Sequence, residues 1–442
     1  MSERLGLPDL HGRLGLLCAV LIDNLGSGIF LPFAVLCATA LAHISIAMTG
    51  LILSLCAACA LPAAPIAGAL ADRFGAQRVV VAAQLLLAMG FAGYLFISTP
   101  LTLFACDFAV AVGSQAYFAT NGAFVARLSP PDQRARWFAL LGACHSAGLG
   151  VGAALSALML TLASSAGYRL LAVANALSFL VAAYLIARVT MPPIEATNSE
   201  RDSHPSARVR RGVRFLRAWR TSKVLGGYQL VLRDGPFLGF TATNVGFSLI
   251  VLSFSVVLPV YLVGPLRLPL WTPGAVFGMN TALVVVAQTT IARWCERYRR
   301  TQALAFSAGL FALALVLLSR LANLPRGVAI GLDGWRLSGL VAATVVYTAA
   351  VLVMAPQKNA LVADAAPDAL RGRYLAFYHL SWSVASTIGP AALTALLAIG
   401  SDWVWLSLTG VAFIVLLALW RLDSALLPYA VRATRQKPLS TS

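Results

Sequence analysis

Charged side chains are scarce in this chain. Asp, Glu, Lys and Arg make up 11% of its 442 residues, and 16 of those are acidic. Soluble globular proteins carry about 25% charged residues. Hydrophobic residues reach 59%, and the mean hydropathy is +0.81. The shortage of polar surface excludes a water-soluble fold and indicates an integral membrane protein.

Cysteine follows no disulfide or metal-binding spacing. Six of the seven cysteines fall within apolar runs, and Cys295 lies just past one. The pair Cys56-x-x-Cys59 stands on an expected membrane helix, where packing of small apolar groups is the preferred interpretation over a redox or metal role.

The sequence also lacks the motifs of enzymes. It contains no nucleophile-base pair, no cluster of metal ligands and no glycine-rich phosphate loop with its Lys-Ser/Thr. We therefore expect no enzyme activity, no cofactor, no metal and no ATP-driven step in this chain.

Long apolar runs are abundant instead. A membrane-crossing helix needs about 20 apolar residues, and twelve runs meet that length, which predicts an all-α integral membrane fold. No cleavable signal peptide is expected, because the first run is too long for one and carries Asp23. The predicted spans are 14–42, 46–71, 79–97, 101–126, 137–163, 167–187, 237–263, 273–292, 302–321, 338–361, 374–398 and 403–420.

The basic residues alternate with the spans. With the N-terminus placed in the cytoplasm, 28 of the 33 Lys and Arg residues lie on the cytoplasmic side and 5 on the other side. This split follows the positive-inside rule and places both termini in the cytoplasm. The net charge of +17 therefore indicates contact with anionic lipids rather than nucleic acid.

The chain divides into two halves of six spans each. We expect an N-terminal bundle at 1–190, a basic cytoplasmic linker at 191–236 and a C-terminal bundle at 237–442. Within the linker, residues 208–223 fit either an amphipathic helix on the membrane surface or a loose charged segment.

The two halves repeat each other weakly. PPDQRARWFALL follows the fourth span and APDALRGRYLAF follows the tenth. Each has Pro-Asp, then Arg-x-Arg, then an aromatic residue that opens the next span. A duplicated unit of this kind places a substrate site near mid-membrane.

A glycine- and arginine-containing loop joins the second and third spans. Its residues, Gly68-x-x-x-Asp72-Arg73-x-Gly75-x-x-Arg78, resemble the signature loop of the major facilitator superfamily. IDNLGSGIFLP and GRYLAFYHLSW are similar to segments of bacterial twelve-span drug:proton antiporters, in particular MdtH-type multidrug-resistance proteins. The resemblance implies two six-helix bundles that transport solutes by alternating access.

The same loop has a mechanical interpretation. Asp72 can accept hydrogen bonds from a helix N-terminus of the other half, which would latch one state of the transporter. Topology alone is the other explanation for its arginines. The expected gate residues are Gly68, Asp72, Arg73, Gly75 and Arg78, with Glu296 and Arg297 in the matching place of the second half.

Asp23 is the acid that the sequence places deepest. It lies nine residues past Leu14, which is about 13 Å into a core roughly 30 Å thick. A carboxyl group away from water gives up its proton less readily, so Asp23 can exchange a proton or pair with a cationic substrate. The alternative is a structural acid that bonds neighbouring helices.

Glycines and a proline follow Asp23 on the first span. Gly26 and Gly28 remove side-chain bulk, and Pro32 predicts a bend. Gly148-x-x-x-Gly152 on the fifth span predicts a face for close helix packing.

Other polar groups inside the spans complete the expected site. Asp107 is either an outer proton relay or simply solvated, and His145 is a further relay candidate. His379 is expected to support a loop. Six amides are expected to line a substrate cavity, or to serve as interhelical partners: Asn24, Gln115, Asn121, Asn244, Asn280 and Gln357.

The sequence thus predicts a proton-coupled exporter of amphipathic small molecules, with protons, substrate and membrane lipids as its partners and a monomer as its form. It is expected in the bacterial cytoplasmic membrane. Two alternatives stay open: a narrow-specificity carrier of a metabolite or lipid-like solute, and a non-transporting receptor or scaffold.

Overall fold

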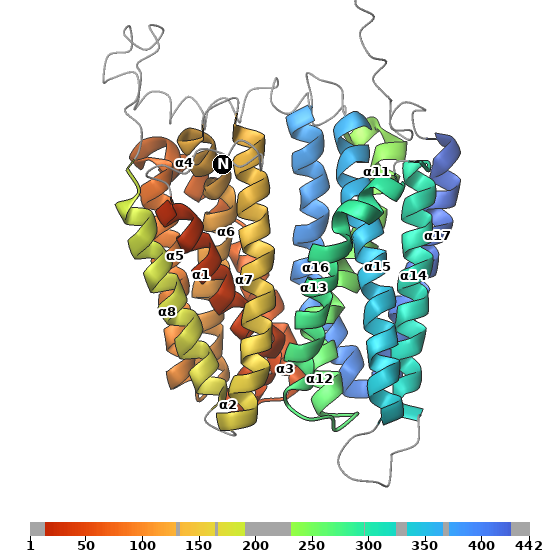
Figure 1. Cartoon of the computed structure of the whole chain (residues 1–442), viewed down its shortest axis with the longest axis horizontal. Helices are drawn as coiled ribbons and strands as arrows, with labels where there is room; N and C mark the ends of the chain where they lie inside the picture. The colour runs from red at the N-terminus through yellow and green to blue at the C-terminus, as the bar shows by residue number, and fades with distance from the viewer. Residues whose placement is uncertain are drawn as a thin grey trace, which may run out of the picture. The chain divides into compact units, whose positions relative to one another are not determined.

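The computed structural model describes residues 14–129, 133–163, 167–190, 231–295, 297–323, 334–365 and 371–425. These residues form helices and no strand, so the predicted all-α fold is confirmed. The helices, drawn in Figure 1, are α1 (Leu14–Phe30), η2 (Leu31–Phe33), α2 (Ala34–Ala42), α3 (Ile46–Ala60), α4 (Ala63–Phe74), α5 (Ala76–Gly93), η3 (Tyr94–Phe96), α6 (Pro100–Leu128), α7 (Arg134–Ala163), α8 (Gly167–Arg188), α11 (Gly235–Val256), α12 (Leu258–Val263), α13 (Thr272–Cys295), α14 (Arg300–Arg320), η5 (Leu321–Asn323), α15 (Gly334–Ala365), α16 (Arg371–Ile399) and α17 (Ser401–Ala425).

The described helices include 11 that are each long and apolar enough to cross a membrane. A twelfth span results when α3 and α4, which meet at a bend of 40°, are taken together. Each of the twelve predicted runs coincides with one of these spans. The chain is therefore a multi-span membrane protein.

Prolines explain where two of the spans break. The predicted span 46–71 is bent because Pro62, at the start of α4, has no N–H to continue the helix from α3. At Pro32, where a bend was predicted, a short 3₁₀ turn, η2, interrupts the α-helix of the first span.

Packing divides the chain into two compact units. Unit 1 comprises Met1–Leu225 with Leu268–Thr281, and unit 2 comprises Gly226–Arg267 with Ala282–Ser442. The bundle boundaries expected from sequence stay a prediction. Most of the expected linker, including residues 208–223, lies outside the described residues.

The two units share one packing order. In unit 1, α1 packs against α7 and α8, and α5 packs against α6 and α8. In unit 2, α11 packs against α16 and α17, and α14 packs against α15 and α17. Helices that stand in the same order along each half therefore make the same neighbours, as expected of a duplicated unit.

The third span of each half is tied to the end of the sixth. In unit 1, Gln77 Nε2 donates to the carbonyl oxygens of Ile186 and Val189, both at 2.8 Å. In unit 2, Arg299 forms an ion pair with Asp423 at 3.1 Å, and Thr301 also donates to Asp423. Different residue types fulfil the same role, which explains why sequence comparison of the halves does not show it.

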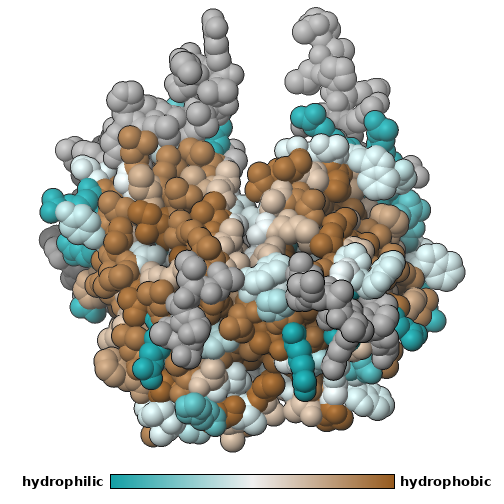
Figure 2. Space-filling view, turned by 60° about the horizontal axis from the view of Figure 1, so that its bottom comes forward, coloured by the Kyte–Doolittle hydropathy of each residue, from teal (hydrophilic) through white to brown (hydrophobic). Residues whose placement is uncertain are grey.

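Large hydrophobic side chains are exposed along the spans. Figure 2 shows hydrophobic residues over much of the visible face. In water such a surface would aggregate, whereas in a bilayer it contacts lipid tails. Exposed examples on α8 and α17 are Leu177, Leu180, Leu406, Ile414 and Leu417.

Candidate functional site

Asp23 lies in the middle of α1 and is buried within unit 1. Its side chain is 5% exposed. Gln84 of α5 donates from Nε2 to Asp23 Oδ2 at 3.0 Å. Within the described part of the chain, no Lys, Arg or His forms an ion pair with Asp23. The carboxyl group is thus held by one neutral amide inside an apolar bundle.

The polar side chains of Asn24 and Tyr117 lie near Asp23, but neither forms a hydrogen bond with its carboxyl group within the described residues. Asn24 is buried and donates to the carbonyl oxygen of Val20, one turn back on its own helix, at 2.7 Å. Tyr117 of α6 lies within electrostatic range of Asp23 and packs against the apolar cluster that contains Val20 and Trp137. The Asn24 amide is thus bonded within α1, and its expected place in a cavity stays a prediction.

Close packing of α1 against α7 fixes the position of Asp23. A Cβ atom added at Gly152 would lie 2.1 Å from the carbonyl oxygen of Leu25, and one added at Gly148 would lie 2.7 Å from that of Leu21. A Cβ atom at Gly28 would lie 2.3 Å from the carbonyl oxygen of Leu149. Only glycine permits this backbone-to-backbone approach, so the predicted packing face of α7 is confirmed.

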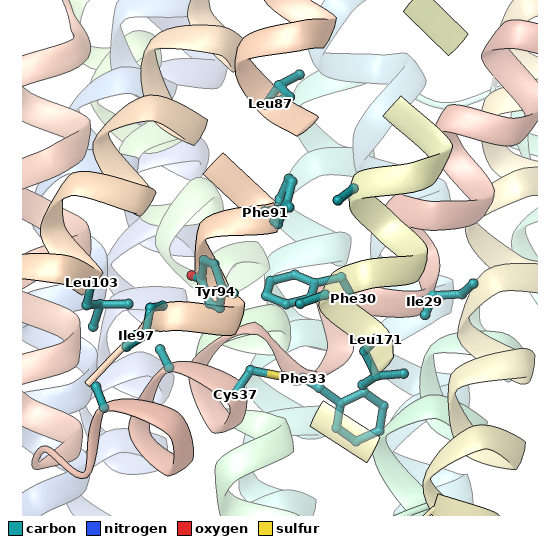
Figure 3. Close-up of a cluster of buried hydrophobic side chains, with 14 of the residues drawn as sticks. Ile29, Phe30, Phe33, Cys37, Leu87, Phe91, Tyr94, Ile97, Leu103 and Leu171 are labelled. Atoms are coloured by element: carbon teal, nitrogen blue, oxygen red, sulfur yellow. The ribbon is translucent and has the colours of Figure 1, made fainter. Parts of the chain in front are cut away.

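Asp107 forms a second buried acidic site in unit 1. Tyr94 donates from its hydroxyl group to Asp107 Oδ1 at 2.6 Å, and Asp107 is 6% exposed. Figure 3 shows Tyr94 among labelled apolar side chains that include Phe30, Phe91 and Leu103. The expectation that Asp107 is simply solvated is wrong, because apolar packing around Tyr94 seals it.

We expect the substitution Tyr94→Phe to destabilise the protein by about 1–3 kcal/mol, because it removes the donor to a buried carboxyl group. Asp107 Oδ2 already has no hydrogen-bond partner among the described residues. Thermal unfolding of the detergent-solubilised protein measures the loss. The double variant Tyr94→Phe/Asp107→Leu should recover most of it, and a double variant less stable than Tyr94→Phe would contradict this explanation.

The remaining expected residues are not brought into one cluster. His145 on α7 is exposed, and no hydrogen bond or ion pair among the described residues joins it to Asp23 or Asp107. His379 on α16 is also exposed. Gln115 and Asn121 on α6 are half-buried, as is Asn280 on α13. The relay and cavity roles of these residues stay predictions.

Asn244 in unit 2 occupies the place that Asp23 has in unit 1. Each is the tenth residue of the helix that forms the first described membrane span of its unit, counted from Leu14 of α1 and Gly235 of α11. Asn244 donates from Nδ2 to Ser381 Oγ of α16 at 2.6 Å and is buried, as is Gln357 of α15. The titratable group of the pair therefore belongs to unit 1 alone.

The expected gate motif lies at the junction of α4 and α5. Gly75 has φ +93°, a conformation that favours glycine, and its N–H donates to the carbonyl oxygen of Ala71 at 2.9 Å. Asp72, Arg73, Arg78 and Arg297 are exposed. A Cβ atom at Gly68 would meet nothing within 4 Å. Glu296 lies outside the described residues.

Sequence reasoning missed Gln84 and Tyr94, the partners of the two buried acids. A signal for Gln84 was present, because it is the single polar residue in the run VVVAAQLLLAMGF from Val79 to Phe91. A polar group in such a run is expensive in the membrane and needs a partner. Tyr94 carries no such signal, since tyrosine is common at the ends of spans.

A family model described as Major Facilitator Superfamily matches the chain over residues 16–356 and again over 272–442. This chain belongs to the major facilitator superfamily. Solved structures of transporters resemble its fold. A mutant of the nucleoside transporter NupG has a TM-score of 0.73 at 14% identity. The match covers 93% of this chain and 99% of the NupG chain. The inward-open xylose transporter XylE from E. coli has a TM-score of 0.65 at 13% identity, covering 92% of this chain and 95% of XylE.

Curated bacterial proteins share sequence with this chain as well. The multidrug resistance protein MdtH of Klebsiella pneumoniae (strain 342) is 29% identical over 366 residues, which are 80% of this chain and 79% of that protein. MdtH of Salmonella newport (strain SL254) is 26% identical over 373 residues, with the same coverage. The chain is thus a major facilitator transporter that resembles bacterial MdtH proteins.

Proposed function

We propose that this protein is a secondary active transporter that exports amphipathic drugs or related small molecules in exchange for protons. The similarity to proteins named for multidrug resistance supports the substrate class. The observation that carries the proton coupling is the burial of Asp23 against the neutral amide of Gln84.

The energetics of Asp23 link its proton to the conformation of unit 1. An ionised carboxylate with one neutral donor is poorly compensated in an apolar interior, so the sealed arrangement suits the protonated form. Ionisation requires water to reach the carboxyl group. Proton release is therefore coupled to opening of the packing around α1, and proton binding to its closure.

Burial also bears on how substrate and proton compete. A side chain that is 5% exposed offers almost no surface to an amphipathic ligand. We infer that the substrate acts on Asp23 through the position of α1 rather than by pairing with the carboxylate. Binding of substrate to one conformation and of a proton to the other is sufficient for exchange.

The exposed residues at the junction of α4 and α5 fit a gate in this scheme. In the proposed gate, Asp72 accepts hydrogen bonds and Arg73 and Arg78 donate them. These bonds stabilise one orientation of the bundles. We place the chain in the inner membrane of a bacterium, with both termini in the cytoplasm.

Uptake of ethidium, an amphipathic cation, into inverted membrane vesicles tests the function. We expect accumulation when an acid-inside gradient is imposed and its collapse when a protonophore is added. Gradient-driven uptake of a metabolite with no uptake of ethidium or other cationic dyes would contradict multidrug export and favour a narrow-specificity carrier. Absence of any gradient-driven uptake would contradict transport itself and favour a receptor or scaffold.

A further inference from the structure

Of the two polar atoms in the Gln84 amide group, one forms a hydrogen bond within the described residues and the other does not. Its side chain is 1% exposed, in the middle of α5. Nε2 donates to Asp23 Oδ2 at 3.0 Å, while Oε1 is buried and has no hydrogen-bond partner among the described residues. Buried polar atoms in native proteins are nearly always bonded, so an orphan beside a titratable group indicates a second arrangement in which it is used.

The amide of glutamine can serve both protonation states of a carboxyl group. Towards an ionised carboxylate it donates from Nε2. Towards a protonated carboxyl group it can still donate from Nε2 to the unprotonated oxygen, while Oε1 can accept a hydrogen bond from the O–H group. The orphan oxygen is therefore the acceptor that the neutral form of Asp23 requires.

We propose that Gln84 is a positioning residue that sets the pH at which Asp23 exchanges its proton, by donating to the ionised form and accepting from the neutral form. This inference rests on the proposed function, because it assumes that Asp23 exchanges a proton during transport. Through Gln84, α5 would take part in coupling proton exchange to transport.

Other polar side chains lie on the helices around Asp23, but Gln84 is the one among the described residues that bonds its carboxyl group. Tyr117 is the titratable group that faces it from α6, and α7, which packs against α1, carries the half-buried Cys144 and the exposed His145. On α8, Ser178 donates to the carbonyl oxygen of Asn175. Within the described residues, Gln84 alone donates a hydrogen bond to the Asp23 carboxyl group.

Substitution of Gln84 by methionine preserves length and removes both amide functions. Both forms of Asp23 lose a hydrogen bond, but the bond to the ionised form is the stronger one, so the ionised form is destabilised more. Asp23 then holds its proton to higher pH. The difference between the two lost hydrogen bonds predicts that the pH midpoint of ethidium transport moves about 1 unit to higher pH.

Gln77→Met is the matched control. Gln77 lies on the same helix, is the same residue type and bonds the backbone of α8 rather than Asp23. We expect it to lower thermal stability and leave the pH midpoint in place. An equal midpoint shift in Gln77→Met would show that general loosening of α5 is responsible, and would overturn the assignment to Gln84.

Infrared titration of the purified protein provides a readout independent of transport. The carboxyl band that disappears in Asp23→Asn is assigned to Asp23, and its midpoint should rise in Gln84→Met and in Gln84→Leu, which serves if the first variant fails to fold. If the Asp23 band titrates in the wild type and its midpoint is the same in the Gln84 variants, the role of Gln84 is overturned and the proposed function stays intact. Absence of any titrating Asp23 band would contradict the proposed function instead.

Discussion

Asp23→Asn is expected to abolish gradient-driven transport while leaving the protein folded. Asparagine has nearly the shape of aspartate, and its Oδ1 can accept the hydrogen bond from Gln84 Nε2 that Asp23 Oδ2 accepts at 3.0 Å. It cannot bind and release a proton in this pH range. The variant should therefore bind and exchange substrate but lose the link to the proton gradient.

The size of the effect follows from the gradient. A difference of one pH unit is worth about 1.4 kcal/mol per proton, which is a tenfold concentration ratio for one-to-one exchange. With a difference of two units, the wild type should accumulate ethidium up to about 100-fold, and Asp23→Asn to a ratio of about 1. Ethidium uptake in proteoliposomes with a set internal pH measures both.

Two further variants make this prediction specific. Asp402→Asn changes an exposed acid at the start of α17 and should transport as the wild type does. Asp107→Asn tests the predicted outer relay. Loss of accumulation in Asp107→Asn together with full accumulation in Asp23→Asn would transfer the coupling role from one buried acid to the other.

Gly152→Ala is expected to cause the largest loss of stability. The added Cβ atom would lie 2.1 Å from the carbonyl oxygen of Leu25, 2.8 Å from the backbone nitrogen of Ile29 and 2.9 Å from Cα of Gly28. All three are backbone atoms, so no side-chain rotation relieves the contacts. The helices α1 and α7 must separate, and overpacking of this kind costs about 3 kcal/mol or more.

Gly142→Ala is the control for this prediction, because it lies on the same helix and its added Cβ atom would meet nothing within 4 Å. Alanine favours a helix over glycine by about 1 kcal/mol, so this variant should be as stable as the wild type or more stable. Thermal unfolding in detergent compares the two. Equal melting temperatures for Gly152→Ala and Gly142→Ala would refute the close crossing of α1 and α7.

The twelve spans and the α7 packing face could be predicted because both depend on local sequence. A run such as 101–126 has the length and hydropathy of a membrane helix whatever surrounds it. Gly148 and Gly152 stand four residues apart, so they lie on one face of any helix. The bend at Pro62 was missed because span 46–71 was judged by hydropathy, which proline changes little.

The partners of the buried acids could not be predicted in the same way. Asp23 and Gln84 are separated by 61 residues, and Asn244 and Ser381 by 137. Such pairs depend on the rotation of each helix about its axis, which tertiary packing decides. Asn24 shows the consequence: its side chain stands next to Asp23 in sequence, yet its amide turns back to Val20.

Proton release on substrate binding measures the coupling between Asp23 and transport without a membrane gradient. Purified protein in weakly buffered detergent solution, near the pH midpoint of transport, is mixed with ethidium while a pH indicator dye records the protons released. Coupling through Asp23 predicts release of up to about one proton per bound ethidium from the wild type and none from Asp23→Asn. Equal release from the two proteins, with equal ethidium binding, would contradict it.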